Sequence, residues 1–320
     1  MTDKLPVRLA ADLAVLAEEH RWLIQDLWAA QAVGVVGGEP KSCKSFLALD
    51  MAVAVASGKP CLRRFPVADP GPVLLYAAED ALHVVRRRLD GIAAVAGVAL
   101  AGLPLHVITA RSLRLDDEDD RARLQLTVDA IRPKLLILDP FVRLHRIDEN
   151  SSGDVAPLLG FLRSLQRRVH VAVCIVHHAK KGAGRIRAGQ ALRGSSEFHA
   201  WGDSNLYMRR SPDQQLVLSV EQRAAASIPA LSLELRADPG DRLALNVVPD
   251  RAPATEAPDL RPADRVEEIL AAATQPVSLS DLRAACHIRT ESLCHTMNDL
   301  LREGRVRKGP AGYTLSRPPL

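Results

Sequence analysis

GVVGGEPKSCKSFLALDMAVAVASG, residues 34–58, places an apolar run, a glycine-rich turn and an apolar segment of helical length in immediate succession. This order predicts a buried strand, a tight loop and a helix. The turn fits the phosphate-binding pattern GxxxxGKS, except that Cys43 stands where the pattern has its second glycine. The residues that we expect to contact a bound nucleotide are Gly38, Glu39, Pro40, Lys41, Ser42, Cys43, Lys44, Ser45 and Phe46.

The chemistry of such a P-loop assigns roles to two side chains. Backbone N–H groups surround the β-phosphate, a lysine bridges the β- and γ-phosphate oxygens, and a hydroxyl reaches Mg²⁺ at the start of the helix. Lys44 and Ser45 have these positions, which predicts ATP and Mg²⁺ as cofactors. The alternative is an ordinary glycine-rich turn. A side chain at Cys43 crowds backbone that must approach the phosphates, and the residue is either a tolerated small one or a redox sensor.

Two further apolar runs end in carboxylates, as ATP hydrolysis by a P-loop protein requires. Residues 134–140 read KLLILDP and residues 73–80 read VLLYAAED. We expect Asp139 to hold a water of the Mg²⁺ shell and Glu79 to orient and activate the attacking water. The alternatives are a strand-end carboxylate without a ligand for Asp139, and capping of the next helix for Glu79 and Asp80.

A fourth apolar run, residues 171–176, ends in the pair His177 and His178. A polar side chain at this strand end can contact the γ-phosphate and transmit its loss to the following loop. We assign that sensor role to His178, and we expect His177 to pack at the strand end. Residues 148–150, which follow the Asp139 strand by a short loop, receive no chemical role.

Apolar runs alternate with segments of helical period along the first three quarters of the chain. Such alternation predicts an α/β fold with a mainly parallel sheet, followed by short strands between residues 205 and 248. Residues 251–262 are rich in Ala, Pro and charged residues and read as a linker. The predicted domains are therefore a core at residues 1–250, the linker, and a small domain at residues 263–320. Three helix-like pieces and a hairpin give that small domain the order of a winged helix.

Composition narrows the class of protein. The chain has 320 residues, a formal net charge of +4 and 47% hydrophobic residues, which suits one large core with a small accessory domain. Its five cysteines are scattered without a disulfide or zinc spacing, which favours a reducing, cytoplasmic compartment. No window approaches the apolar length of a membrane span, so we expect no membrane association.

The motifs GGEPKSCKS, LLYAAED, LLILDP, CIVHHAKKG and LRGSSEFHAWGDSNLYMRR occur in this order. As a set they resemble the hexameric replicative helicase ATPases of the RecA-like superfamily, and in particular the plasmid RepA-type helicases with their AAA-like relatives. The resemblance covers residues 22–210 and implies a RecA-like P-loop NTPase core that assembles as a ring. It implies catalytic roles for Glu79, Lys44, His178 and Arg209, with Ser45 and Asp139 at Mg²⁺. Arg209 would be an arginine finger supplied to a neighbouring subunit, and Arg210 beside it is the alternative.

Two basic regions suggest contact with nucleic acid. The first is a glycine-containing loop without acidic residues, whose cations are Lys180, Lys181, Arg185, Arg187 and Arg193. In the family that it resembles, this loop faces the central channel, where its charges would follow a phosphate backbone. The alternative is a solvated loop without a partner. The second region is the C-terminal domain, for which DNA and protein partners both stay open.

Taken together, the sequence predicts an Mg²⁺-dependent ATP hydrolase that binds single-stranded DNA. We expect a homo-oligomer, most simply a hexamer, that acts as a helicase or translocase in DNA replication of a plasmid or mobile element, with replication proteins as further partners. One alternative is a DNA-binding regulatory ATPase that does not unwind. Another is an interaction protein in which Cys43 has abolished turnover.

Overall fold

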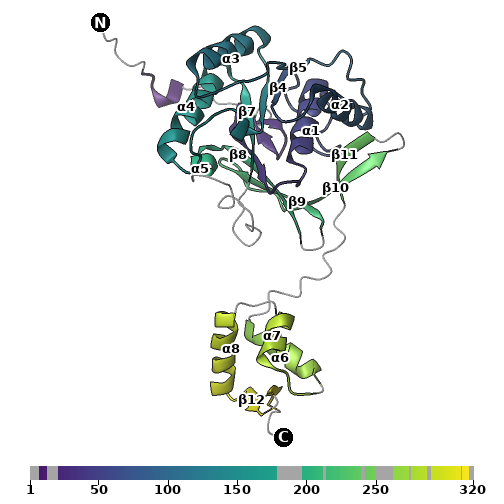
Figure 1. Cartoon of the computed structure of the whole chain (residues 1–320), viewed down its shortest axis with the longest axis vertical. Helices are drawn as coiled ribbons and strands as arrows, with labels where there is room; N and C mark the ends of the chain where they lie inside the picture. Colours follow the sequence, from purple (N-terminus) through teal and green to yellow (C-terminus); the bar gives the residue numbers. More distant parts are fainter. Residues whose placement is uncertain are drawn as a thin grey trace. The chain divides into compact units, whose positions relative to one another are not determined.

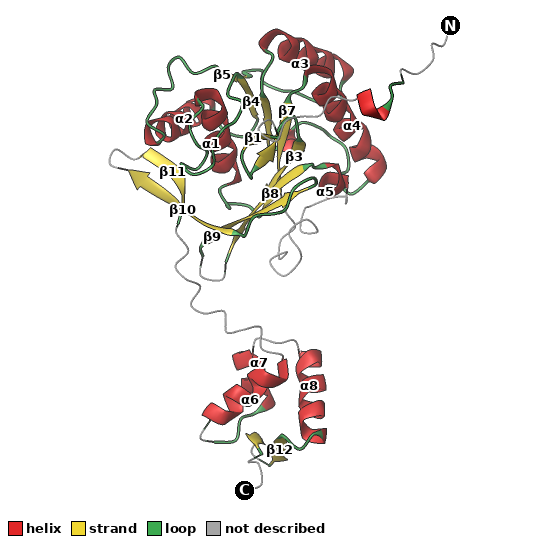
Figure 2. Ribbon diagram, turned by 180° about the vertical axis from the view of Figure 1, so that it is seen from behind, coloured by secondary structure: helices red, strands yellow, loops and turns green. Residues whose placement is uncertain are grey.

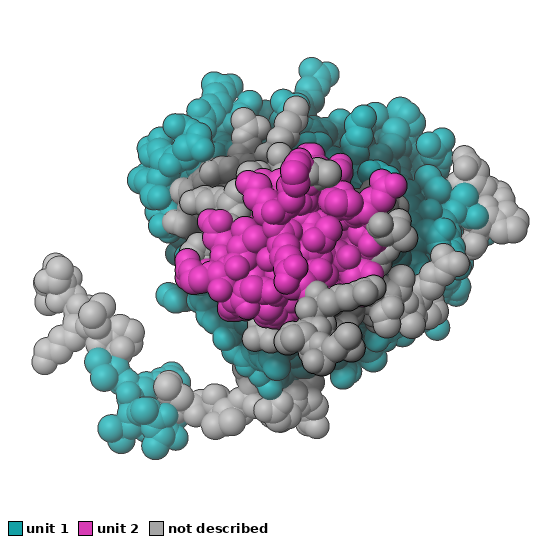
Figure 3. All heavy atoms as spheres, turned by 90° about the horizontal axis from the view of Figure 1, so that it is seen from below, with its two compact units in different colours: residues 1–250 teal, residues 251–320 magenta. Residues whose placement is uncertain are grey.

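The computed structural model describes residues 7–12, 21–178, 197–211, 214–238, 242–248, 262–273, 275–286, 290–310 and 312–316. The chain divides into two compact units, residues 1–250 and residues 251–320 (Figure 3). The first unit has two buried clusters of hydrophobic side chains and the second unit has one, and we describe the two units separately.

One large sheet runs through the first unit (Figure 1). Among the described residues it has nine strands in the order β11-β10-β9-β8-β3-β7-β6-β4-β5. Strands β5, β4, β6, β7, β3 and β8 pair in parallel, whereas β8, β9, β10 and β11 pair antiparallel. The strand bounds are β3 Val33–Gly38, β4 Val73–Ala77, β5 Leu105–Val107, β6 Leu135–Asp139, β7 Ala172–His178, β8 Ser204–Arg210, β9 Leu216–Gln222, β10 Leu231–Asp238 and β11 Arg242–Val247. The predicted α/β class with a mainly parallel sheet is therefore confirmed.

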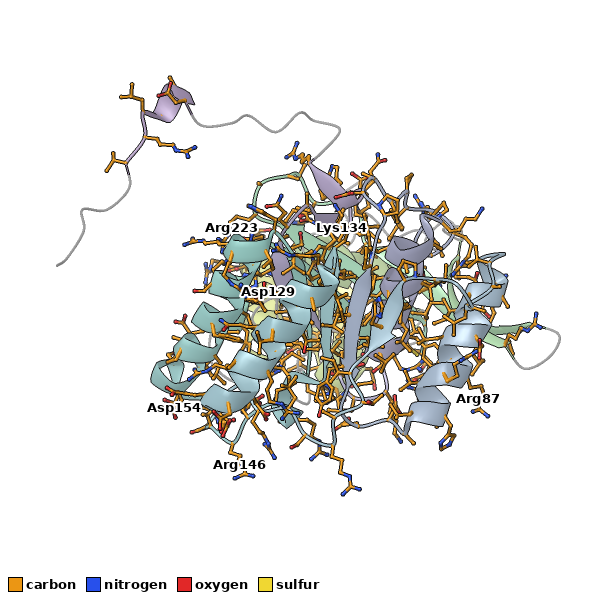
Figure 4. The ribbon with its side chains drawn as sticks, turned by 90° about the horizontal axis from the view of Figure 1, so that it is seen from above. Arg87, Asp129, Lys134, Arg146, Asp154 and Arg223 are labelled. Atoms are coloured by element: carbon orange, nitrogen blue, oxygen red, sulfur yellow. The ribbon has the colours of Figure 1, made fainter. Side chains whose placement is uncertain are left out.

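Helices cover both faces of this sheet (Figure 2). On one face α1 (Lys44–Ser57) and α2 (Leu82–Val95) bury their apolar residues in one cluster, and on the other α3 (Glu118–Ile131), α4 (Ser152–Val169) and α5 (Glu197–Trp201) bury theirs in a second. Viewed along the sheet, Arg87 of α2 and Asp129 of α3 lie on opposite sides of the strands (Figure 4). Parallel strands with both faces covered explain why their sequences are almost continuously apolar.

Strand β3 lies in the middle of the sheet and all six of its residues are buried. Gly34 is a packing requirement, since a Cβ there would lie 1.7 Å from the carbonyl oxygen of Ser204 in β8. The side chains of Asp203 and Asn205 accept hydrogen bonds from the backbone N–H groups of Val33 and Val35. These contacts hold β3 and β8 at a spacing that any larger residue would disrupt.

A strand pair and a short helix of the first unit lie outside the sequence expectations. Residues 22–29 form a small antiparallel pair of strands, β1 (Trp22–Ile24) and β2 (Trp28–Ala29), in which Trp28 is fully buried. The short helix α5 falls within the LRGSSEFHAWGDSN motif, to which the sequence assigned no helix. Both are too short to show a periodic pattern of apolar residues.

The second unit packs three helices and a strand pair around its own apolar cluster. Helix α6 (Pro262–Ala272) contacts α7 (Leu279–Cys286) and α8 (Thr290–Arg302), and β12 (Val306–Gly309) pairs antiparallel with β13 (Gly312–Leu315). The Ser278 hydroxyl accepts a hydrogen bond from the Asp281 N–H at the start of α7, as expected of an N-cap. The described residues of both units include no helix that is long and apolar enough to cross a membrane.

The close approach at Gly34 leads to a stability prediction. We expect Gly34→Ala to lower the free energy of unfolding by about 3 kcal/mol, because the added methyl group meets backbone that cannot turn away. In the matched control Gly160→Ala on α4, the new Cβ would meet no described atom within 4 Å, so helix propensity should stabilise the protein by about 0.5–1 kcal/mol. Urea unfolding of both variants measures the difference, and equal midpoints would contradict this account of β3.

Candidate active site

The loop between β3 and α1 is fixed by its backbone. Gly38 has a φ of 154°, and a Cβ there would lie 2.1 Å from the carbonyl oxygen of Met208. Lys41 and Cys43 both have a φ of 63°, in the left-handed region that side chains disfavour. Cys43 precedes the first residue of α1 and makes no side-chain capping bond. The loop thus retains the conformation of a glycine at the position where the sequence has cysteine.

Lys44 begins α1 and is almost completely buried. Its Nζ donates a hydrogen bond to the carbonyl oxygen of Glu39 at 2.7 Å, across the mouth of the loop. Burial lowers the pKa of Lys44 to about 8, against the opposing effects of Asp139, Cys43 and Glu79. A buried ammonium group with one neutral acceptor is poised to accept an anion in the loop.

Asp139 ends β6, and its carboxylate accepts a hydrogen bond from the Ser45 side chain. Burial raises the pKa of Asp139 to about 6, with the Ser45 hydrogen bond opposing and the charge of Asp80 reinforcing the shift. Carboxylate and hydroxyl oxygens are ligands that Mg²⁺ accepts alongside phosphate and water oxygens. The structure therefore brings together the two residues that the sequence assigned to Mg²⁺, and the chemistry of the pair fits that ion.

The two carboxylates that follow β4 bind arginines. Glu79 Oε1 accepts a hydrogen bond from Arg143 Nε at 2.9 Å, and Asp80 forms an ion pair with Arg88. The Arg88 guanidinium also lies 5.1 Å from the ring centroid of Phe46, the residue after Ser45. Helix α2 begins after Ala81, which makes no side-chain capping bond. Neither arginine could be singled out from the sequence, because Arg143 is 64 residues from Glu79 and the spacing of eight between Asp80 and Arg88 is not a pairing distance of one helical turn.

The two histidines at the end of β7 have different surroundings. His177 is buried and stacks on Phe198 with ring centroids 4.2 Å apart, so the packing expected of it is confirmed. His178 is partly buried and pairs in register with Gly38 at the start of the P-loop. This position places it beside the nucleotide loop, where the proposed sensor role requires it.

Two adjacent arginines at the end of β8 face different surroundings. Side chains alternate along a strand, so Arg210 shares the sheet face of Met208 and Arg209 the opposite face. Arg210 donates a hydrogen bond to the carbonyl oxygen of Lys41 at 3.4 Å and thus contacts the P-loop of its own chain. Arg209 is exposed. The predicted nucleic-acid residues Lys180, Lys181, Arg185, Arg187 and Arg193 lie outside the described residues.

The site thus gathers Lys44, Ser45, Glu79, Asp139 and His178 at the carboxyl ends of β3, β4, β6 and β7. Charge interactions connect several of them, since Asp139 and Glu79 both act on Lys44. A family model described as AAA domain matches residues 3–184, more than half of the chain. The matched segment includes the P-loop, the strands that end in Asp139 and His178, and strand β4 with Glu79 just beyond its end.

The backbone at Cys43 predicts a gain of affinity. The left-handed backbone at Cys43 costs a residue with a Cβ roughly 1 kcal/mol with or without nucleotide. We therefore expect Cys43→Gly to stabilise the folded protein by about that amount, and to bind ATP more tightly because its Cβ no longer crowds the phosphates. Cys43→Ala, which keeps the Cβ and removes the thiol, is the control and should bind like the wild type. Calorimetric titration with Mg-ATP measures both constants. Equal affinities for the two variants, both higher than that of the wild type, would show that the thiol rather than the Cβ limits binding.

The raised pKa of Asp139 predicts a pH-dependent stability effect. Its folded-state pKa of about 6 lies above the ordinary 3.8, so the ionised group destabilises the folded protein above pH 6 and has no effect below pH 4. We expect Asp139→Asn to stabilise the nucleotide-free protein by about 2 kcal/mol at pH 7.5, since each pKa unit is about 1.4 kcal/mol and partial exposure reduces the full value. Urea unfolding at pH 7.5 and pH 4 tests this, and a gain that persists unchanged at pH 4 would refute it.

Proposed function

Since this chain belongs to the AAA domain family of P-loop ATPases, we propose that it is an Mg²⁺-dependent ATP hydrolase that couples turnover to DNA. The observation that carries the ATPase proposal is the contact between Ser45 and Asp139 beside a buried Lys44. These residues provide the hydroxyl, the carboxylate and the cation that the reaction needs at one edge of the sheet.

Lys44 supplies the first step, which is capture of the phosphates. Its Nζ exchanges the Glu39 carbonyl oxygen for phosphate oxygens, and a charged acceptor reverses part of the cost of burying the ammonium group. Ser45 and Asp139 would hold Mg²⁺, which would supply positive charge against the charge that develops on the phosphates. Glu79 accepts a proton from the attacking water, and His178 contacts the γ-phosphate from the neighbouring strand end.

More specifically, we propose a ring-shaped helicase or translocase of the plasmid RepA type. Arg209 is the residue whose role tests this proposal. The exposed position of Arg209 at the end of β8 supports a role in the site of a neighbouring copy. Arg210 instead donates a hydrogen bond to Lys41 in the P-loop of its own chain. This contact supports Arg209, rather than Arg210, as the residue that reaches a neighbouring copy. The resemblance to the RepA-type helicases is the ground for proposing a hexamer that acts on single-stranded DNA in plasmid or mobile-element replication.

We also propose that residues 263–320 form a winged helix that contacts DNA. The order of three helices and an antiparallel strand pair supports the fold. Exposed Arg307 and Lys308 on β12 suit phosphate contacts, whereas Arg305 is paired with Glu267 and Glu303. A regulatory ATPase that binds DNA through this unit without unwinding it is the second candidate.

A third candidate is an interaction protein whose P-loop no longer supports turnover. The observation in its favour is the left-handed backbone at Cys43, which glycine would adopt without strain. Phosphate release with Mg-ATP, with and without single-stranded DNA and at two salt concentrations, separates the candidates. Stimulation by DNA that falls with salt supports the motor, and a forked-DNA unwinding assay then distinguishes helicase from regulator. No release under any condition supports the interaction protein.

Two variants test the active site directly. We expect Lys44→Ala to abolish phosphate release, whereas Lys59→Ala, an exposed lysine just beyond the other end of α1, should leave it unchanged. Arg209→Ala should retain ATP binding and lose turnover, because the finger acts only in the transition state. If sites are shared between copies, an equimolar mixture of Lys44→Ala and Arg209→Ala should regain part of the activity. Loss of ATP binding in Arg209→Ala would contradict the interface role.

A further inference from the structure

The ion pair between Arg143 and Glu79 joins two segments at the active site. Arg143 ends the short 3-10 helix Phe141–Arg143 that follows β6, and Glu79 lies beyond the end of β4. Arg143 Nε donates to Glu79 Oε1 at 2.9 Å, while their side chains are 62% and 43% exposed. An exposed ion pair contributes little to stability. Its effect is therefore one of geometry, since a single N–H fixes one oxygen of the carboxylate.

The backbone that carries Arg143 is anchored on both sides. Phe141 and Leu144 are fully buried, and the Arg143 N–H donates to the carbonyl oxygen of Pro140 at 3.1 Å. The Leu144 carbonyl oxygen accepts a hydrogen bond from the Leu115 N–H. An exposed guanidinium on a fixed backbone gives Arg143 a restricted reach, directed at Glu79.

A buried polar cluster ties the next residues to the end of β7. His145 Nε2 lies 3.3 Å from Glu149 Oε1, and His177 Nδ1 lies 3.8 Å from the same oxygen. The ring of Phe141 packs against those of His145 and Phe198 at centroid distances of 4.8 and 5.4 Å. His177 stacks on Phe198 in turn. The segment with Arg143 is thereby joined to the strand that carries His178.

The ion pair keeps Glu79 within the site. Glu79 follows β4 by two residues, and Ala77, the last residue of β4, pairs in register with Asp139 at the end of β6. The carboxylate that Arg143 binds therefore follows a strand end that lies beside Asp139. The contact with Arg143 is therefore compatible with a working position of Glu79.

We propose that Arg143 is a positioning residue for ATP hydrolysis, which orients the carboxylate of Glu79 toward the attacking water. The role rests on the proposed ATPase function and deepens it. Arg143 touches neither substrate nor metal in this assignment, and it acts through Glu79. The segment that carries Arg143 packs against the end of β7, which carries His178. The proposed γ-phosphate sensor and Glu79 are therefore connected through the same segment.

Arg146 provides a matched control on the same segment. Its side chain is exposed and points away from the body of the unit (Figure 4). Its interaction with Asp116 uses the backbone N–H, at 3.2 Å, so substitution of the side chain leaves that bond in place. Arg146→Ala thus removes the same charge from the same loop without touching Glu79.

The experiment compares wild type, Arg143→Ala and Arg146→Ala in the full chain by steady-state phosphate release, Mg-ATP titration and thermal unfolding. We expect Arg143→Ala to lose at least ten-fold in kcat, with KM within about two-fold and Tm unchanged, and Arg146→Ala to match the wild type. Millimolar guanidinium should restore part of kcat in Arg143→Ala and have no such effect on Arg146→Ala. A purely structural role would instead lower Tm and would not respond to guanidinium.

The outcomes separate this assignment from the function on which it rests. An active wild type with Arg143→Ala equal to Arg146→Ala overturns the assignment alone. A rise of kcat in Arg143→Ala also overturns it, because the pair would then restrain Glu79 rather than position it. A wild type that releases no phosphate overturns the proposed function and the assignment together.

Discussion

The site depends on the packing of β3 between β7 and β8. This strand is buried on both faces, and glycines at 34 and 38 let the carbonyl oxygens of Ser204 and Met208 approach where no side chain would fit. The same contacts fix where β3 ends, and the P-loop starts there. The positions of Lys44 and Ser45 relative to Asp139 thus follow from backbone spacing in the middle of the sheet rather than from contacts among the side chains themselves.

The site is electrostatically costly before any ligand binds. Burial lowers the pKa of Lys44 and raises that of Asp139, so each group disfavours its charged form although the two charges are opposite. Their attraction does not compensate fully for the loss of water. A triphosphate with its metal would complete the interactions of both groups, which links binding affinity to a cost already present in the folded chain.

The central strands and their carboxylates could be predicted from sequence because both signals are local. An apolar run ending in Asp139 or Glu79 is visible in a few residues, and parallel strands bring such ends to one edge. The arginine partners could not be predicted, since Arg143 and Glu79 are 64 residues apart and no periodicity connects them. The same holds for Arg88 with Phe46, and for the parallel pairing of β8 with β3, which joins residues 170 positions apart along the chain. The effect of Cys43 on turnover could not be predicted either, because it depends on the backbone angle φ at that residue, which amino-acid composition does not reveal.

The two arginines at the end of β8 make that strand sensitive to the parity of its length. Because alternate residues face opposite sides of a sheet, an insertion or deletion of one residue within Ser204–Arg210 would exchange the surroundings of Arg209 and Arg210. A change of two residues would preserve both. The length of this strand can therefore change only by an even number of residues if both arginines are to keep their positions. A β-bulge there would turn the residue that contacts the nucleotide loop of its own chain to the opposite face of the sheet.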